Sequence, residues 1–177
     1  MDDPQVVLGA AARFLEARSR SVAEVRRRLT SVGYLPVLVD GAIERMIELG
    51  MLNDEAFARA WVESRDRARP RGERAIRSEL ALKGVERTVV DTILVDRREA
   101  VAEATGTDPA AGSADQAAAE RLIAKHARAL ARVEEPRQRR QRAYALLARN
   151  GFDPETCRDV AARVAGSPAQ EASERMD

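Results

Sequence analysis

The side chains with the clearest capacity for chemistry in this sequence of 177 residues are its arginines, which gather in three groups. A guanidinium group pairs through two hydrogen bonds with a phosphate or a carboxylate, so dense arginines are typical of surfaces that bind a polyanion or an acidic polymer. We therefore select as candidate contact residues Arg18, Arg20, Arg26, Arg65, Arg69, Arg71, Arg74, Arg77, Lys83, Arg139 and Arg140. The alternative is that these residues only form solvated helix faces, as charged residues on helices usually do.

Residues that could support catalysis are few and isolated. His126 is the only histidine, and it stands beside Lys125 without a carboxylate or a thiol next to it. Cys157 lies on an apolar stripe, which indicates packing rather than a nucleophile. Asp153 and Glu155 are explained as acidic residues at a helix start and not as metal ligands. We expect no enzyme activity, no metal and no cofactor.

A repeated pattern defines the elements that carry the arginines. Leu29–Gly33, Leu80–Gly84 and Leu147–Gly151 each place a leucine four residues before a glycine. Apolar residues also recur eight before, six after and ten after each glycine: Val25, Ile76 and Ala143; Val39, Val90 and Cys157; Ile43, Leu94 and Ala161. This spacing predicts buried helix faces, and glycine commonly ends a helix in the left-handed conformation. The sequence thus predicts three copies of one helical unit.

Each unit is predicted to contain three helices, and no segment alternates with period two as a half-buried strand would. A stretch of small and polar residues at 105–115 is typical of a linker, and the polar C-terminal end is typical of a disordered tail. The expected organisation is repeat 1 at 1–52, repeat 2 at 53–104, the linker at 105–115, repeat 3 at 116–166 and the tail at 167–177.

Two local patterns refine this prediction. Ser21 and Glu24 have the spacing of a capping box, which predicts the start of the middle helix of repeat 1. Trp61 follows Phe57 by four residues on one helical face, so we expect Trp61 to anchor a core. Stacking of Trp61 on a nucleic-acid base is the alternative.

The composition limits both the class of site and the compartment. Hydrophobic residues reach 45%, but only 3% are aromatic, which predicts thin cores between close helices and no deep ligand cavity. A single cysteine gives no disulfide, as expected in a reducing cytosol. The acidic start of the sequence does not resemble a secretion signal, and no apolar run approaches the length of a membrane span. We expect a cytoplasmic protein that does not enter a membrane.

Charge is balanced over the chain but sorted within each repeat. The net charge of +1 excludes a simple polycationic nucleic-acid binder. The middle helices are basic, with net charges of +2 for 22–32, +2 for 71–83 and +5 for 137–149. The third helices carry −2 for 36–49, −1 for 86–99 and 0 for 155–164, which is the wrong sign for recognition helices in a duplex. A tandem helix-turn-helix DNA-binding protein and a helical-repeat adaptor nevertheless stay open as alternatives.

Five motifs together cover most of the chain: Leu15–Leu29, Leu52–Ala58, Arg65–Gly72, Ile76–Gly84 and Leu147–Phe152. In these motifs the sequence resembles the RecX family, the regulatory proteins that modulate the RecA recombinase of bacteria. The resemblance implies an all-α fold of three tandem three-helix repeats, stacked into an elongated, curved molecule without enzymatic activity of its own.

The same resemblance implies the partners. Proteins of this family bind the RecA recombinase filament on single-stranded DNA, lie along its helical groove and restrain its ATPase and strand exchange. They thereby regulate DNA repair, DNA recombination and the SOS response. For this chain we accordingly expect the RecA filament and its single-stranded DNA as partners, weak direct binding of DNA as a further property, and a monomeric state.

Overall fold

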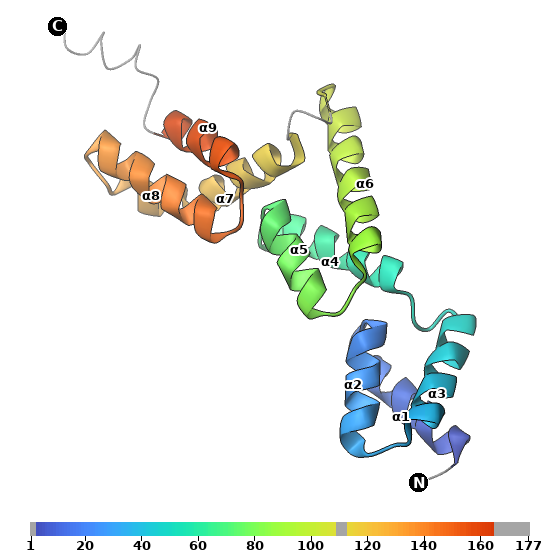
Figure 1. Ribbon diagram of the computed structural model, residues 1–177. Helices are drawn as coiled ribbons and strands as arrows, with labels where there is room; N and C mark the ends of the chain where they lie inside the picture. Colours follow the sequence, from blue (N-terminus) through green and yellow to red (C-terminus); the bar gives the residue numbers. More distant parts are fainter. Residues whose placement is uncertain (1–2, 109–112, 165–177) are drawn as a thin grey trace, which may run out of the picture. The chain divides into compact units, whose positions relative to one another are not determined.

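Nine α-helices and no strand lie in the residues that this computed structural model describes, 3–108 and 113–164 (Figure 1). The first three are α1 (Pro4–Glu16), α2 (Val22–Val32) and α3 (Pro36–Glu48). Repeat 2 contains α4 (Asp54–Ala68), α5 (Glu73–Leu82) and α6 (Arg87–Thr105). Repeat 3 contains α7 (Ser113–Ala131), α8 (Pro136–Arg149) and α9 (Pro154–Val164). The predicted all-α fold of three-helix repeats is confirmed, whereas the tail predicted at 167–177 lies outside the described residues.

The ends of the middle helices follow the local signals in the sequence. Ser21 Oγ accepts a hydrogen bond from the Glu24 amide at 3.2 Å, and the Glu24 carboxylate accepts one from the Ser21 amide at 3.3 Å, which confirms the capping box. Gly33, Gly84 and Gly151 have φ values of +95°, +77° and +81°. Because a side chain disfavours this left-handed conformation, glycine is the natural residue at these three helix ends.

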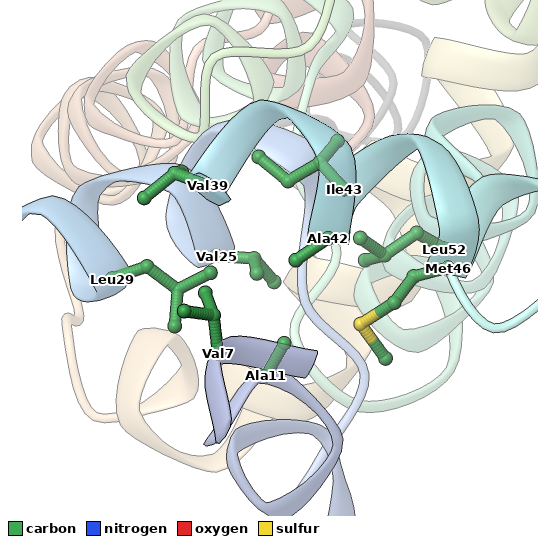
Figure 2. Packing of buried hydrophobic residues seen from close by; sticks show 9 residues of the cluster. All are labelled: Val7, Ala11, Val25, Leu29, Val39, Ala42, Ile43, Met46 and Leu52. Atoms are coloured by element: carbon green, nitrogen blue, oxygen red, sulfur yellow. The ribbon is translucent and has the colours of Figure 1, made fainter. Parts of the chain in front are cut away.

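The core of repeat 1 is built from one face of each of its helices (Figure 2). Its buried residues are Val7 and Ala11 of α1, Val25 and Leu29 of α2, Val39, Ala42, Ile43 and Met46 of α3, and Leu52. Every apolar position predicted from the repeat pattern is buried in all three repeats, including Cys157 and Ala161 in repeat 3. The recurring leucine and its neighbours therefore form the buried stripe that the spacing predicts.

By packing, the chain divides into two compact units. Unit 1 comprises Met1–Val62 and Arg77–Ile93, and unit 2 comprises Glu63–Ile76 and Leu94–Asp177. The helices α4, α5 and α6 of repeat 2 each contribute one end to unit 1 and the other end to unit 2. Each unit therefore contains a junction between two repeats.

Helix limits differ from the expectation at the predicted linker, 105–115. Helix α7 begins at Ser113, inside that segment, and Asp115 is buried. The composition of the segment misled the prediction because the contacts that order Asp115 come from residues distant in the sequence. Within the described residues, none of the helices combines the length and the apolar character that crossing a bilayer requires.

Candidate functional site

Arg18 and Lys83, both predicted as partner contacts, converge on Glu24 in unit 1. Arg18 Nη2 and Lys83 Nζ each lie 2.9 Å from Glu24 Oε1, and the Glu24 side chain is only 11% exposed. Burial alone would raise the pKa of Glu24, but the hydrogen bonds from Arg18, Lys83 and the Ser21 amide outweigh it and lower the pKa from 4.5 to about 2. In the folded chain, Lys83 therefore links the end of α5 to Glu24 at the start of α2, and Arg18 links the α1–α2 connection to the same carboxylate.

Trp61 belongs to the same cluster but is only half-buried. Its Nε1 donates a hydrogen bond to Glu79 Oε2 at 2.8 Å, and Lys83 Nζ lies 5.1 Å from the centroid of its ring. The Phe57 ring, which is buried, lies 5.9 Å from it between centroids. The prediction that Trp61 anchors a core is thus only partly correct, because Trp61 forms a cation–π contact at the edge of the core, beside the buried Phe57.

The junction in unit 1 places the start of α2 directly against the end of α5 and the start of α4. Ser21 Oγ donates to the Lys83 carbonyl at 2.6 Å, and the Val22 amide donates to Asp54 Oδ1 at 2.8 Å. A Cβ atom on Gly84 would lie 2.4 Å from the Cβ of Ala23, far inside contact distance. Amides at the start of α2 are therefore satisfied by the next repeat as well as by the capping box.

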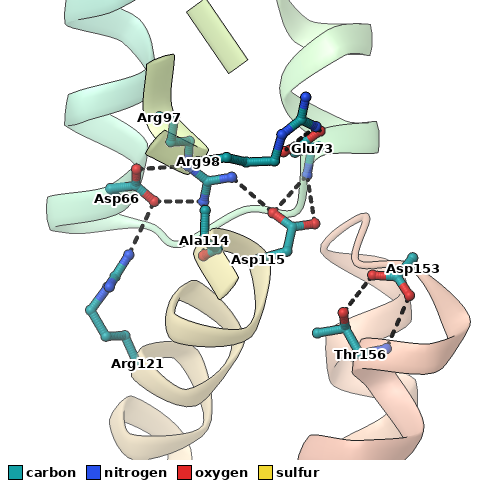
Figure 3. Close-up of polar contacts among 9 residues, drawn as sticks. All are labelled: Asp66, Glu73, Arg97, Arg98, Ala114, Asp115, Arg121, Asp153 and Thr156. Atoms are coloured by element: carbon teal, nitrogen blue, oxygen red, sulfur yellow. Dashed lines mark hydrogen bonds and ion pairs between the residues drawn. The ribbon is translucent and has the colours of Figure 1, made fainter. Parts of the chain in front are cut away.

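The junction in unit 2 repeats this arrangement at the start of α5 (Figure 3). The Gly72 amide donates to the Asn150 carbonyl at 3.0 Å, and the Glu73 amide donates to Asp115 Oδ2 at 3.0 Å. A Cβ on Gly72 would lie 2.2 Å from the carbonyl oxygen of Gly151. The two junctions thus share one hydrogen bond. In each, an aspartate in the first turn of a repeat's first helix accepts a hydrogen bond from the first amide of the middle helix in the preceding repeat.

A buried arginine reinforces the junction in unit 2. Arg97, whose side chain is 5% exposed, lies 2.9 Å from Asp66 and 2.8 Å from Asp115 (Figure 3). Burial alone would lower the pKa of Arg97, but the two carboxylates outweigh it and raise this pKa above its ordinary value. Arg121 also reaches Asp66, at 3.1 Å, and Arg98 pairs with Glu73 at 3.0 Å. None of these residues was selected from the sequence.

Two further predicted contacts, Arg26 and Arg77, form equivalent ion pairs within their repeats. Arg26 pairs with Asp40, joining α2 to α3, and Arg77 pairs with Asp91, joining α5 to α6. The hydrogen bond from Arg77 lowers the pKa of Asp91 below its ordinary value. These four side chains are between 39% and 50% exposed, so each pair contributes only modestly to stability.

The other predicted contacts have different environments. The guanidinium of Arg20 stacks on Phe14 at 4.3 Å, Arg71 donates to Asn150 Oδ1 at 2.8 Å, and Arg139 donates to the Val133 carbonyl at 2.9 Å. Arg65 is half-buried on α4, and Arg74 is exposed on α5. The side chains of Arg69 and Arg140 are exposed, and neither makes a hydrogen bond or an ion pair within the part of the chain that the structure describes. Fewer of the predicted contact residues are therefore exposed without a partner in the described fold than the sequence alone indicated.

The residues rejected as catalytic have ordinary environments. His126 is exposed, and Cys157 is buried, as predicted for packing. Burial raises the pKa of the Cys157 thiol, which makes the reactive thiolate scarcer. Among the described residues, no three histidine, cysteine, aspartate or glutamate side chains are grouped so that they could hold a metal ion.

Known proteins match the chain over all three repeats. Family models described as the first, second and third three-helix domains of RecX match residues 8–46, 53–94 and 114–161. A regulatory protein RecX of Mycobacterium sp. (strain JLS) is 32% identical over 151 residues, which are 84% of this chain and 75% of the relative. A regulatory protein RecX of Chlorobium phaeobacteroides (strain BS1) is 29% identical over 158 residues, 89% of this chain and 93% of the relative. The crystal structure of RecX from Lactobacillus salivarius has the same fold, with a TM-score of 0.72 and 17% identity over 91% of this chain and 96% of that one.

Proposed function

Because this chain belongs to the RecX family of regulatory proteins, we propose that it binds RecA-type recombinase filaments on single-stranded DNA and inhibits their ATPase and strand exchange. It would thereby regulate DNA repair and recombination. The observation that carries the proposal is the match of successive RecX domain models to all three repeats, which leaves no repeat outside the family pattern.

The distribution of charge supports binding to a nucleoprotein polymer. Middle helices α2 and α8 present exposed arginines, and residues 137–149 carry a net charge of +5. A DNA-containing filament is a polyanion, and guanidinium groups pair with its phosphates and with carboxylates of the recombinase. We propose a regulator without a catalytic reaction of its own that acts in the cytoplasm as a monomer.

The environments of the basic side chains divide six of the proposed contacts into three kinds. Arg69 and Arg140 are exposed and make no side-chain hydrogen bond or ion pair within the described residues, so they are the most direct candidates for filament contact. Arg26 and Arg77 are in half-exposed ion pairs, and exchanging such a pair for a phosphate costs little free energy. Lys83 supports the junction in unit 1 through Glu24, and Arg18 binds the same carboxylate from within repeat 1.

Titration of this protein into the single-strand-dependent ATPase of the same organism's RecA tests the proposal. We expect the rate of ATP hydrolysis to fall as the protein is added. Inhibition well below one copy per recombinase would indicate action at filament ends, and inhibition only near saturation would indicate coating of the filament. An unchanged ATPase rate on intact filaments would overturn the assignment.

A further inference from the structure

One pair of equivalent positions differs in chemistry between the three repeats. Seven residues before and seven after the repeat glycine, repeats 1 and 2 place an arginine and an aspartate that form an ion pair, whereas repeat 3 places a tyrosine and an arginine: Arg26 with Asp40, Arg77 with Asp91, and Tyr144 with Arg158. The pair that joins the middle helix to the third helix is therefore missing from α8 and α9.

A groove lies at this position in repeat 3. It has a volume of about 520 Å³ and is lined by Arg140, Gln141 and Tyr144 of α8 and by Arg158 and Asp159 of α9, together with two alanines. Tyr144 is 36% exposed, so part of this residue is accessible from the solvent. The volume is within the range of about 300–1,000 Å³ that is typical of small-molecule sites.

The charges in the groove favour a ligand with a single negative group. Arg140 and Arg158 make no hydrogen bond or ion pair through their side chains in the described residues, so both guanidinium groups are available. Helix α8 adds to the positive potential, since residues 137–149 contain five arginines and no acidic residue. Asp159 places one carboxylate in the same lining and disfavours a second anionic group beside the first.

We propose that this groove binds one nucleotide unit, with its phosphate paired to Arg140 and Arg158 and its base stacked on Tyr144. Stacking on an aromatic ring next to a basic track is the general mode by which proteins hold single-stranded nucleic acid. Gln141 carries both a hydrogen-bond donor and an acceptor, which suits it to the edge of a base. An acidic peptide would satisfy the arginines but would leave the exposed ring of Tyr144 without a partner. The inference concerns this chain alone and does not rest on the proposed action on RecA.

The chain itself offers a matched test variant. The double substitution Tyr144→Arg with Arg158→Asp installs the ion pair of repeats 1 and 2, so repeat 3 should fold while its groove loses the ring and gains a carboxylate. This variant lowers the net charge by one. Arg128→Ala lowers the net charge by one as well, at an exposed position on α7 outside the groove, and is the control.

Binding is measured by fluorescence anisotropy of a labelled oligothymidylate of about 12 nucleotides, without recombinase. We expect the double variant to bind at least about tenfold more weakly than the unmodified protein, and Arg128→Ala to bind within about threefold of it. Equal affinities for the double variant and the control would overturn the proposal, as would failure of the unmodified protein to bind. Should the double variant fail to fold by circular dichroism, Tyr144→Phe must retain binding and Tyr144→Ala must lose it.

Competition with free thymidine monophosphate distinguishes the sources of the nucleotide. Displacement of the oligonucleotide by the free nucleotide would show that the groove takes an isolated nucleotide, and groove-dependent binding without displacement would show that it requires a strand. The ATPase titration on the same variants keeps the two proposals separate. If the double variant loses oligonucleotide binding but still inhibits the ATPase, both the nucleotide site in the groove and the action on the filament are supported.

Discussion

Among single residues of unit 1, Glu24 has a strongly lowered pKa. Its carboxylate receives hydrogen bonds from Arg18, Lys83 and the Ser21 amide, and its pKa is about 2 instead of 4.5. Because the folded pKa is below the ordinary value, ionised Glu24 stabilises the fold above about pH 4.5. That contribution is lost as the pH falls from 4.5 toward 2.

The substitution Glu24→Gln tests this linkage. At pH 7 we expect the free energy of unfolding to fall by about 1–3 kcal/mol, measured by urea denaturation. The difference in unfolding free energy between the variant and the unmodified protein should shrink below pH 4.5. There the unmodified protein loses the stabilisation from ionised Glu24, which the variant already lacks. Glu55→Gln is the control, because Glu55 is 60% exposed in its pair with Arg59 and should cost less than about 0.5 kcal/mol. Parallel pH profiles for Glu24→Gln and the unmodified protein would contradict the assigned role.

Arg97 is the residue from which we expect a large contribution to stability in unit 2, because it joins two carboxylates in a buried position. Replacing Arg97 with alanine leaves Asp66 and Asp115 without their buried cation, and we expect a loss of about 3–5 kcal/mol in unfolding free energy. Arg121 binds the same Asp66 but is 44% exposed, so Arg121→Ala should cost under about 1 kcal/mol. Similar losses for both variants would show that burial does not set the strength of this network.

At the scale of the helices, glycine meets two different requirements at the repeat glycines: a left-handed backbone, and a lack of space for a Cβ atom. Gly33 and Gly84 both have left-handed backbones, but a Cβ on Gly33 meets open space, whereas a Cβ on Gly84 meets Ala23 at 2.4 Å. Gly33→Ala should therefore cost about 1–2 kcal/mol from the backbone alone. Gly84→Ala should cost about 1–3 kcal/mol more, because the junction must open.

Thermal and chemical unfolding of the two variants measure this difference. Ala23→Gly should restore part of the stability of Gly84→Ala, since it removes the atom that the new methyl group meets. The same second substitution should lower the stability of Gly33→Ala, because glycine inside α2 costs about 1 kcal/mol. Lack of any rescue would place the strain of Gly84→Ala in its backbone and not in the junction.

The sequence predicts these elements well where their determinants are local. Val25 and Leu29 reveal the buried face of α2 through their spacing, and Ser21 with Glu24 marks its start, because both signals act within one or two turns. Asp115 has no such local signal, because its partners Glu73 and Arg97 are 42 and 18 residues away. Its small and polar sequence neighbours instead have the composition of a linker. Contacts of this kind depend on how repeats pack, which no periodicity within one helix encodes.

The candidate site could be predicted by residue type but not by environment. Sequence alone identified the arginines, yet it could not distinguish Arg71, which bonds to Asn150, from Arg69, which is exposed two residues earlier. A guanidinium group serves an internal carboxylate or amide as well as an external phosphate. Only the folded partners decide which of the two it does.

For the whole molecule, this distinction gives a functional prediction. Arg69→Glu should weaken inhibition of the RecA ATPase several-fold and leave the melting temperature unchanged, because the Arg69 side chain is exposed and makes no hydrogen bond or ion pair within the described residues. Arg71→Glu should lower the melting temperature, since it removes the bond to Asn150 at the junction in unit 2. Arg128→Glu, on α7, controls for the change of charge. Undiminished inhibition by Arg69→Glu would move the contact surface away from the α4–α5 connection.

The junction in unit 1 also has a consequence for synthesis on the ribosome. The Ser21 hydroxyl finds its acceptor at Lys83, 62 residues later, and the Val22 amide finds Asp54, 32 residues later. At the usual elongation rate of about 5–20 residues per second, the nascent chain waits roughly 3–12 seconds between making Ser21 and making Lys83. From Glu48 onward the first three helices are complete in sequence, but the start of α2 lacks its acceptor until Lys83 is made, and a slow codon or a bound chaperone would act on the protein during that part of the interval.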